Sequence, residues 1–255
     1  MTDCPSASIW MGVGSPTSGL FIRDAKSFLR WLVAQDYIEH KFLMAFEDTI
    51  KKRKVEVDHR IYSALEVRAL YNAADQFSPQ WRDFLRFQLL TAQRHADVAR
   101  MEWQHVDLAQ HTWTQPANRT KNGRAHIVHL SAPALEILKA MQPQVGKARG
   151  LVFTTTTGGA MHHNNERNKA YFRNAQVEHG GRHAFRHTMV TLLAQCGHSE
   201  DVVDMALGHA RKGVNAVYQK FQYLEQRADA LDDWGQIVIG QRDAMKVLRQ
   251  HRGTG

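Results

Sequence analysis

The sequence predicts a mainly α-helical protein with a small antiparallel β-sheet or hairpin, an α+β fold. Apolar residues recur at helical spacing through most of the chain, and from residue 166 this pattern continues nearly to the C-terminus. Residues 111–131 (HTWTQPANRTKNGRAHIVHLS) instead have strand character on both sides of Asn122-Gly123, a dipeptide typical of hairpin turns. The β component is therefore expected within an otherwise helical chain.

The N-terminal part predicts a helical segment between two less regular stretches. Residues 1–20 are rich in Gly, Ser, Thr and Pro without periodicity, so we expect them to be mobile. Residues 24–46 carry apolar residues at helical spacing and predict one or two amphipathic helices. The charged residues 51–60 follow and indicate a linker or the edge of a domain. This stretch begins with Lys51, Lys52, Arg53 and Lys54.

Helices are predicted on both sides of the hairpin. Ser63 and Glu66 match a capping box, in which each side chain bonds the backbone N–H of the other residue, so a helix should begin there. Residues 80–108 predict a mostly apolar helix, a short break and a second helix. Residues 151–160 (LVFTTTTGGA) predict a strand that ends in a glycine turn.

The segment 181–197 (GRHAFRHTMVTLLAQCG) predicts a helix with one buried face and a basic first turn. At about 100° per residue, one narrow stripe carries four residues, namely Phe185, Met189, Leu192 and Cys196. His183, Arg186 and His187 should point away from that stripe. Three basic groups on one turn indicate an anionic partner.

Composition favours a nucleic-acid partner. Of 255 residues, 33 are Lys or Arg and 25 are Asp or Glu, a net charge of +8 that favours polyanions, nucleic acid first and anionic membranes second. No apolar run approaches the roughly 20 residues that a membrane span needs. The N-terminus does not resemble a secretory signal. Cys4 and Cys196 are too few for a disulfide framework. We therefore expect a cytoplasmic protein.

The histidines do not predict a metal site. His183 and His187 have the i, i+4 spacing of helical zinc ligands, but Ala184 stands where an H-E-x-x-H motif has its glutamate. His162 and His163 are neighbours in a loop, and the chain has no C-x-x-C pair. A G-x-x-x-x-G-K-[ST] loop is also absent. We expect no metal, no cofactor and no nucleotide-driven chemistry.

Several polar residues occur in a specific order along the chain. Taken alone, each of them fits an ordinary structural position, such as a helix cap, a solvated turn or a half-buried aromatic ring. They are Arg94, Lys121, the H-x-x-R pair His183 and Arg186, the L-G-H histidine His209, and Tyr218 nine residues further on. This order resembles the active-site set of the tyrosine recombinase (phage integrase) family. The resemblance covers about residues 60–235 and includes the context of the residues, such as the Arg segment LLTAQRHADVARMEWQHVDL with its acidic Asp97.

The resemblance implies a domain organisation. Residues 56–235 would form the tyrosine recombinase catalytic domain, and residues 21–55 a remnant of the helical core-binding domain plus a basic linker. Residues 236–255 would be a C-terminal tail. Its apolar run Ile237–Ile239 fits either docking on a neighbouring subunit or packing on its own domain.

The resemblance also implies a reaction and a role for each residue. The Tyr218 hydroxyl would attack a DNA phosphorus and form a covalent 3′-phosphotyrosyl intermediate, without metal or ATP. The arginines 94 and 186 would clamp the non-bridging oxygens, because planar guanidinium groups bind two oxygens at once. Three further roles follow: Lys121 would protonate the leaving 5′-oxygen, His183 would exchange the tyrosine proton, and His209 would donate to a non-bridging oxygen. Asp97 would orient Arg94.

The implied partners are double-stranded DNA and further copies of the chain. Relatives act as tetramers on two synapsed sites, with accessory DNA-bending proteins in some systems, so a nucleoid-associated cytoplasmic homo-tetramer is expected. The basic run Lys51, Lys52, Arg53 and Lys54, with Arg124 in the hairpin, would contact DNA. His187 has no family role and is structural or close to DNA.

Three alternatives stay open. The first alternative is a truncated relative that binds DNA without completing recombination, because residues 21–55 would supply only a small part of the core-binding domain. A metal-dependent nuclease built on the histidines would cleave in an EDTA-sensitive way. A type IB topoisomerase uses related chemistry, although the hairpin and the tyrosine segment are more integrase-like.

Overall fold

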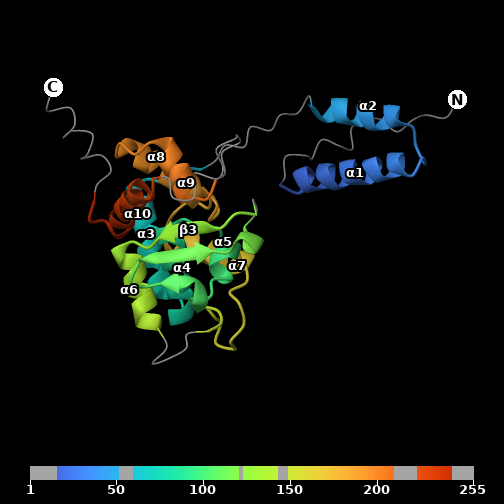
Figure 1. Ribbon diagram of the computed structural model, residues 1–255. Helices are drawn as coiled ribbons and strands as arrows, with labels where there is room; N and C mark the ends of the chain where they lie inside the picture. Colours follow the sequence, from blue (N-terminus) through green and yellow to red (C-terminus); the bar gives the residue numbers. More distant parts are fainter. Residues whose placement is uncertain (1–15, 52–59, 121–122, 143–148, 210–222, 243–255) are drawn as a thin grey trace, which may run out of the picture. The chain divides into compact units, whose positions relative to one another are not determined.

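The chain divides into two units, residues Met1–Asp58 and His59–Gly255. The structure is a computed structural model and describes residues 16–51, 60–120, 123–142, 149–209 and 223–242 (Figure 1). Among the helices of these ranges, none has the length and apolarity that a membrane crossing requires.

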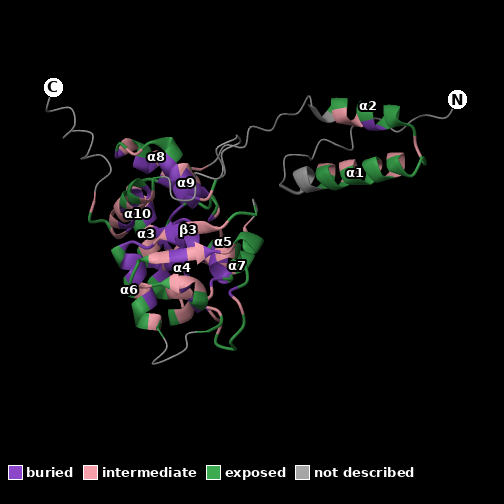
Figure 2. Ribbon diagram, viewed as in Figure 1, coloured by how far each residue is buried: buried purple, intermediate pink, exposed green. Residues whose placement is uncertain are grey.

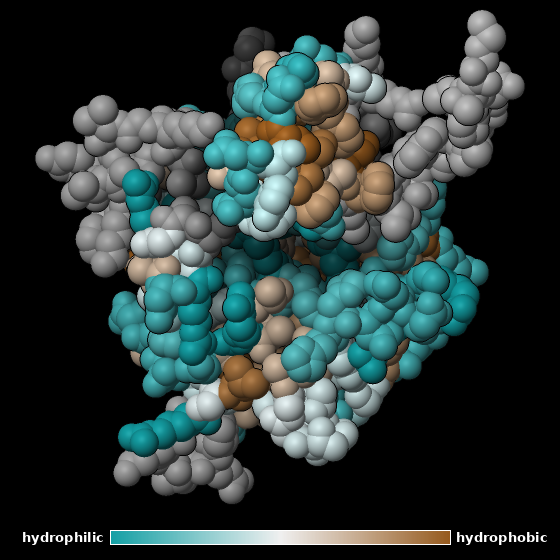
Figure 3. Space-filling view, turned by 90° about the vertical axis from the view of Figure 1, so that its right-hand side faces the viewer, coloured by the Kyte–Doolittle hydropathy of each residue, from teal (hydrophilic) through white to brown (hydrophobic). Residues whose placement is uncertain are grey.

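The first unit contains two helices, as the periodicity predicts. α1 spans Pro16–Ala34 and α2 spans His40–Lys51. α1 begins inside the stretch that we expected to be mobile, with a proline at its first position, where the missing N–H costs no hydrogen bond. Lys26 on α1 forms an ion pair of 2.9 Å with Glu47 on α2. In Figure 3 apolar side chains (brown) gather on the surface of this two-helix unit.

The second unit is mainly helical with one small sheet, which confirms the predicted fold class. Its helical elements are α3 (Ala64–Ala73), η2 (Ala74–Gln76), α4 (Pro79–Thr91), α5 (His95–Ala99), η3 (Trp103–His105), η4 (Ala117–Arg119), α6 (Ala132–Met141), α7 (Asn165–Asn174), α8 (Ala184–Gln195), α9 (Glu200–Ala206) and α10 (Leu224–Ile239). The capping box at the start of α3 is confirmed: Glu66 N donates to Ser63 Oγ at 3.2 Å, and Ser63 N donates to Glu66 Oε2 at 2.8 Å.

The sheet has three antiparallel strands in the order β1 (Val106–Asp107), β2 (Thr112–Gln115) and β3 (His126–His129). Trp113 pairs with Val128, and both are buried, so this face of the sheet packs on the core. In Figure 1 the sheet lies in front of α4, and β3 contacts α9 and α10.

The predicted hairpin is therefore present, but its connection is longer than a two-residue turn. Residues 116–125 join the strands, with η4 in between, and Gly123 has a left-handed φ of +65°. The strand predicted over residues 151–160 is wrong. Only two isolated bridges form there, one at Leu151 and one between Thr154 and Ala160, so no continuous ladder supports a strand.

α10 packs against α3, α4, α6, α8 and α9 in the core of the second unit, and Figure 2 shows buried residues around it on α8, α9 and β3. Trp234 on α10 is buried and donates from Nε1 to the carbonyl of Leu89 at 2.8 Å. Ile237 and Val238 are buried in the same core. This apolar run therefore packs on the chain's own domain, with Ile239 partly buried at the edge of the same core.

Candidate active site

The Arg94 side chain emerges where the chain reverses between two helices. α4 ends at Thr91, and Ala92 takes a left-handed conformation with φ of +48°. Arg94 then caps the start of α5, with its side chain 38% exposed. The reversal therefore places a guanidinium group at the surface of the second unit.

Asp97 lies one turn further along α5, between two arginines. Its carboxylate oxygens are 3.8 Å from Arg94 Nη1 and 3.9 Å from Arg100 Nη2. Burial raises the pKa of Asp97, although both arginines act in the opposite direction. This geometry suits a group that orients Arg94.

Arg186 is buried, with only 2% of its surface exposed, although it lies outside the stripe of α8 that the periodicity predicts to be buried. That stripe itself is confirmed, since Phe185, Met189, Leu192 and Cys196 are all buried. Helical periodicity predicts one buried face, whereas the turns at Ala92 and Leu207 also contact the first turn of α8.

The guanidinium of Arg186 joins two turns of the backbone. Its Nη1 donates to the carbonyl of Ala92 at 2.9 Å, and its Nη2 donates to the carbonyl of Leu207 and to His209 Nε2, the latter at 3.0 Å. Burial, with repulsion from the neighbouring Arg94 cation, lowers the pKa of Arg186 to about 10, so the group stays protonated at neutral pH. Its Nε–H is buried without an acceptor among the residues that the structure describes.

His209 follows α9 after a glycine with φ of +71° at residue 208. Its Nδ1 lies 2.8 Å from an Asp204 carboxylate oxygen. Because a guanidinium only donates, His209 Nε2 accepts from Arg186, and Nδ1 carries the proton that Asp204 accepts. In this state His209 is an acceptor at Nε2, so donation to a substrate oxygen requires Nε2 first to gain a proton.

His183 is the N-cap residue of α8 and is exposed. Its ring lies 5.4 Å, centroid to centroid, from the ring of His187 on the next turn. The structure thus brings Arg94, Asp97, Arg186 and His209 to one place, with His183 on the helix that carries Arg186.

Most of the remaining predicted site residues lie outside the ranges that the structure describes. Lys121 and Tyr218 lie outside the described residues, as do Lys52, Arg53 and Lys54. Lys51 ends α2, and its backbone alone is described. Arg124 is exposed in the hairpin, where its backbone N–H donates to Thr120 Oγ1 at 3.0 Å, so both sides of position 121 are described.

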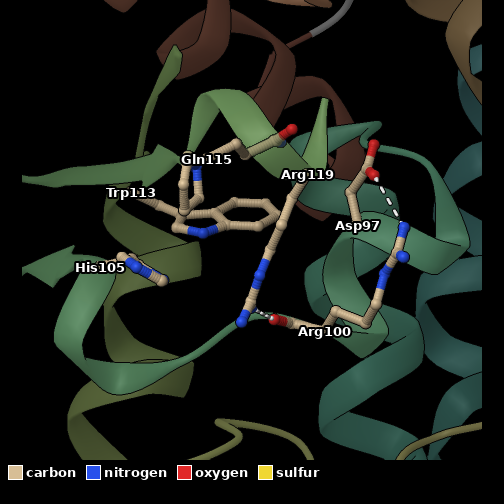
Figure 4. Close-up of a pocket in the computed structure, with 7 residues that line it drawn as sticks. Asp97, Arg100, His105, Trp113, Gln115 and Arg119 are labelled. Atoms are coloured by element: carbon tan, nitrogen blue, oxygen red, sulfur yellow. Dashed lines mark hydrogen bonds and ion pairs between the residues drawn. The ribbon is translucent and has the colours of Figure 1, made fainter. Parts of the chain in front are cut away.

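A small pocket lies beside Asp97, lined by Asp97, Arg100, His105, Trp113, Gln115, Pro116 and Arg119 (Figure 4). Arg119 extends past the Trp113 ring, donates to the carbonyl of Arg100 at 3.0 Å and pairs with Glu102. The volume, about 20 Å³, holds little more than one water. The contacts of Arg119 therefore hold the base of the hairpin in place, and the pocket is too small for a nucleotide.

A larger hollow of about 330 Å³ lies between the starts of α4 and α7, and its described lining includes no predicted catalytic residue. Its lining includes Trp81, His162, His163 and Arg167. Within the described ranges, no three His, Cys, Asp or Glu side chains are grouped as a metal ion would require.

Sequence reasoning missed a polar layer beneath these groups, made by Gln93, Gln115 and His126. The two glutamines are buried, and His126 Nε2 lies 3.1 Å from the carbonyl of Ala206. Burial, with a smaller effect of the Arg227 cation, lowers the pKa of His126 to about 3, so its ring is neutral. The sequence clue was a glutamine between an apolar helix and Arg94, where a solvent-exposed residue is the ordinary expectation.

Comparison with known proteins identifies similar chains. A model of the phage integrase family matches residues 61–225. Prophage integrase IntA of Escherichia coli (strain K12) is 34% identical over 161 residues, which are 62% of this chain and 38% of IntA. Prophage integrase IntZ of the same strain is 30% identical over 175 residues, 68% of this chain and 43% of IntZ. The matched region spans less than half the length of either relative.

Solved structures share the fold. The integrase from mycobacterium phage Brujita matches with a TM-score of 0.55 and 19% identity, over 88% of this chain and 75% of that one. A lambda integrase tetramer bound to a Holliday junction matches with a TM-score of 0.58 and 18% identity, over 80% and 62%. At these identities the likeness establishes the fold.

Proposed function

Because the chain belongs to the phage integrase family, we propose that it is a site-specific DNA recombinase that cleaves and rejoins DNA through a 3′-phosphotyrosyl intermediate on Tyr218, without metal or ATP. The observation that best supports this function is the single guanidinium of Arg186, which joins the turn before Arg94 to the turn that carries His209. Groups that the family pattern places far apart in sequence thus meet.

The chemistry needs fixed cationic donors. As the tyrosine oxygen bonds to phosphorus and the bond to the 5′-oxygen breaks, negative charge gathers on the non-bridging oxygens. Arg94, at the surface, and Arg186, whose Nε–H has no acceptor within the described ranges, supply donors for these oxygens. His183 takes the phenol proton, and Lys121 gives one to the leaving 5′-oxygen. No water is consumed, so the 5′-hydroxyl can reverse the step and rejoin the strand.

We further assign the partners by this function. The net charge of +8 suits a DNA backbone, which the basic run Lys51–Lys54 and Arg124 would contact. The related lambda integrase was solved as a tetramer on a Holliday junction. We infer the same assembly on two synapsed sites for this chain, in the nucleoid, with accessory DNA-bending proteins where the DNA site requires them.

Trapping the covalent intermediate tests the function. A pool of duplexes with randomised sequence and a nick near each candidate scissile bond loses a short 5′-hydroxyl fragment after cleavage, so the adduct cannot reverse. We expect an SDS-resistant protein–DNA adduct with wild type, none with Tyr218→Phe, and no change with EDTA.

Each other outcome supports an alternative. DNA binding without an adduct under any condition would identify a binding remnant. EDTA-sensitive cleavage that survives Tyr218→Phe would identify a metal-dependent nuclease. Relaxation of supercoiled plasmid at positions without a common sequence would identify a type IB topoisomerase.

A further inference from the structure

The residue directly before Arg94 is a buried glutamine whose amide is engaged at both ends. Gln93 is 2% exposed. Its Nε2 donates to the carbonyls of Thr91, at 3.1 Å, and Ala206, at 3.2 Å. Its Oε1 accepts from Nε2 of Gln115, at 3.2 Å. Because carbonyls only accept, they fix which end of the Gln93 amide carries the nitrogen.

The carbonyl of Ala206, at the end of α9, receives a second donor from β3. His126 Nε2 donates to it at 3.1 Å. The imidazole also lies against Gly208, where an added Cβ would come within 3.0 Å of Cδ2 of His126. The last carbonyls of a helix have no partner within the helix, so these donors hold an end that would otherwise be unsatisfied.

Two neighbouring points therefore fasten the turn before Arg94 to the turn before His209. Arg186 bridges the carbonyls of Ala92 and Leu207. Gln93, which follows Ala92 in the chain, donates to the carbonyl of Ala206, which precedes Leu207. One attachment would leave the turns free to rotate about it, whereas two adjacent attachments fix their relative orientation.

We propose that Gln93, supported by Gln115 on β2, is a positioning residue that sets the orientation of Arg94 relative to His209. This inference rests on the proposed function. The pair acts through the backbone and touches no substrate. Gln115 holds the Gln93 amide in place, and without it the Gln93 oxygen would be buried with no donor. Misplacement of a transition-state donor by about 1 Å costs roughly 10²-fold in rate.

Single-turnover kinetics with the nicked DNA pool test this role. Gln93→Met keeps the volume and removes the amide. We expect the rate constant of adduct formation to fall about 10- to 100-fold, while the dissociation constant for DNA, measured at one fixed salt concentration, stays within about twofold. Gln115→Met should show a smaller fall of the same kind. The double variant should be no slower than Gln93→Met, because both changes break one unit.

The matched control is Gln88→Met. Gln88 is also buried, and its Oε1 accepts from the side chain of Arg182 at 3.1 Å. This control should lose thermal stability and keep the wild-type rate constant in the folded fraction.

The outcomes separate this inference from the function on which it rests. An adduct with wild type and an equal rate with folded Gln93→Met would overturn the positioning role alone, as would equal losses in Gln93→Met and Gln88→Met. The absence of any adduct with wild type would overturn both. If Gln93→Met does not fold, Gln115→Met decides the question. A lower rate constant of adduct formation with unchanged DNA affinity would support the positioning role, and a wild-type rate constant would overturn it.

Discussion

Replacing Arg94 and Arg186 by lysine, one at a time, should affect thermal stability differently. Arg186 supports the fold as well as the proposed reaction, whereas Arg94 acts on the substrate alone. Arg186 holds the carbonyls of Ala92 and Leu207 and the ring of His209 from a buried position. Lysine has one nitrogen and cannot span these acceptors, so Arg186→Lys leaves at least one of them without a donor. A buried group without its partner costs about 1–3 kcal/mol.

A loss of about 3 kcal/mol in the free energy of unfolding corresponds to a fall in Tm of roughly 6–12 °C for a domain of this size. Arg94 differs, because its side chain is 38% exposed and its ion pair with Asp97 is long, at 3.8 Å. Arg94→Lys should therefore shift Tm by only about 1–2 °C, as surface substitutions do. Both variants should slow adduct formation about 10²- to 10³-fold, because each removes one preorganised donor.

Differential scanning calorimetry and the nicked-DNA adduct assay, run on the same preparations, measure the two effects. The reasoning fails if Arg186→Lys melts with wild type, because Arg186 would then not hold the two turns. It also fails if Arg94→Lys unfolds, or if either variant cleaves at the wild-type rate.

Three further predictions concern single residues. Gly208→Ala should lower the free energy of unfolding by about 1–2 kcal/mol, because residue 208 has a left-handed φ of +71° and an added Cβ would press on the His126 ring. Thermal melting measures this loss, and an unchanged Tm would contradict the close approach of Gly208 to His126. Burial raises the pKa of Asp97, so ionising it costs folded-state stability as pH rises from below the ordinary carboxyl range to neutral. The free energy of unfolding of Asp97→Asn, measured by urea denaturation, should accordingly increase relative to that of wild type as pH rises over this interval. A relative decrease would refute the burial argument. Trp234→Phe removes the bond to the Leu89 carbonyl and should cost about 1–3 kcal/mol by the same method, whereas Ile239→Val at the edge of the core should cost less than half as much.

Local rules in the sequence were enough for several features. The capping box needs only Ser63 and Glu66, three residues apart, so its geometry is decided within one helical turn. The buried stripe of α8 follows from helical periodicity, and the alternation around residues 111–131 correctly places two paired strands. The turn-forming dipeptide did not set the length of the connection, because η4 and the Arg119 contacts also shape it.

Features that depend on distant segments were not predictable. The periodicity of α8 placed Arg186 outside the buried stripe and could not show that it is buried, because its acceptors Ala92 and Leu207 come from segments 94 and 21 residues away along the chain. No local pattern in the sequence marked Gln93 and Gln115 as buried. Their amide contact depends on how β2 lies against the end of α4.

The sequence alone determined the fold class, the family and the order of the candidate catalytic residues, because those depend on residue type, spacing and local hydrogen bonding. The tertiary structure alone decided that the C-terminal apolar run packs on its own domain, that Arg186 is buried, and that the Arg94 and His209 turns are tied at two points. The physical reason is that a buried polar group must find its partner, and folding brings that partner from a segment whose place no local pattern specifies.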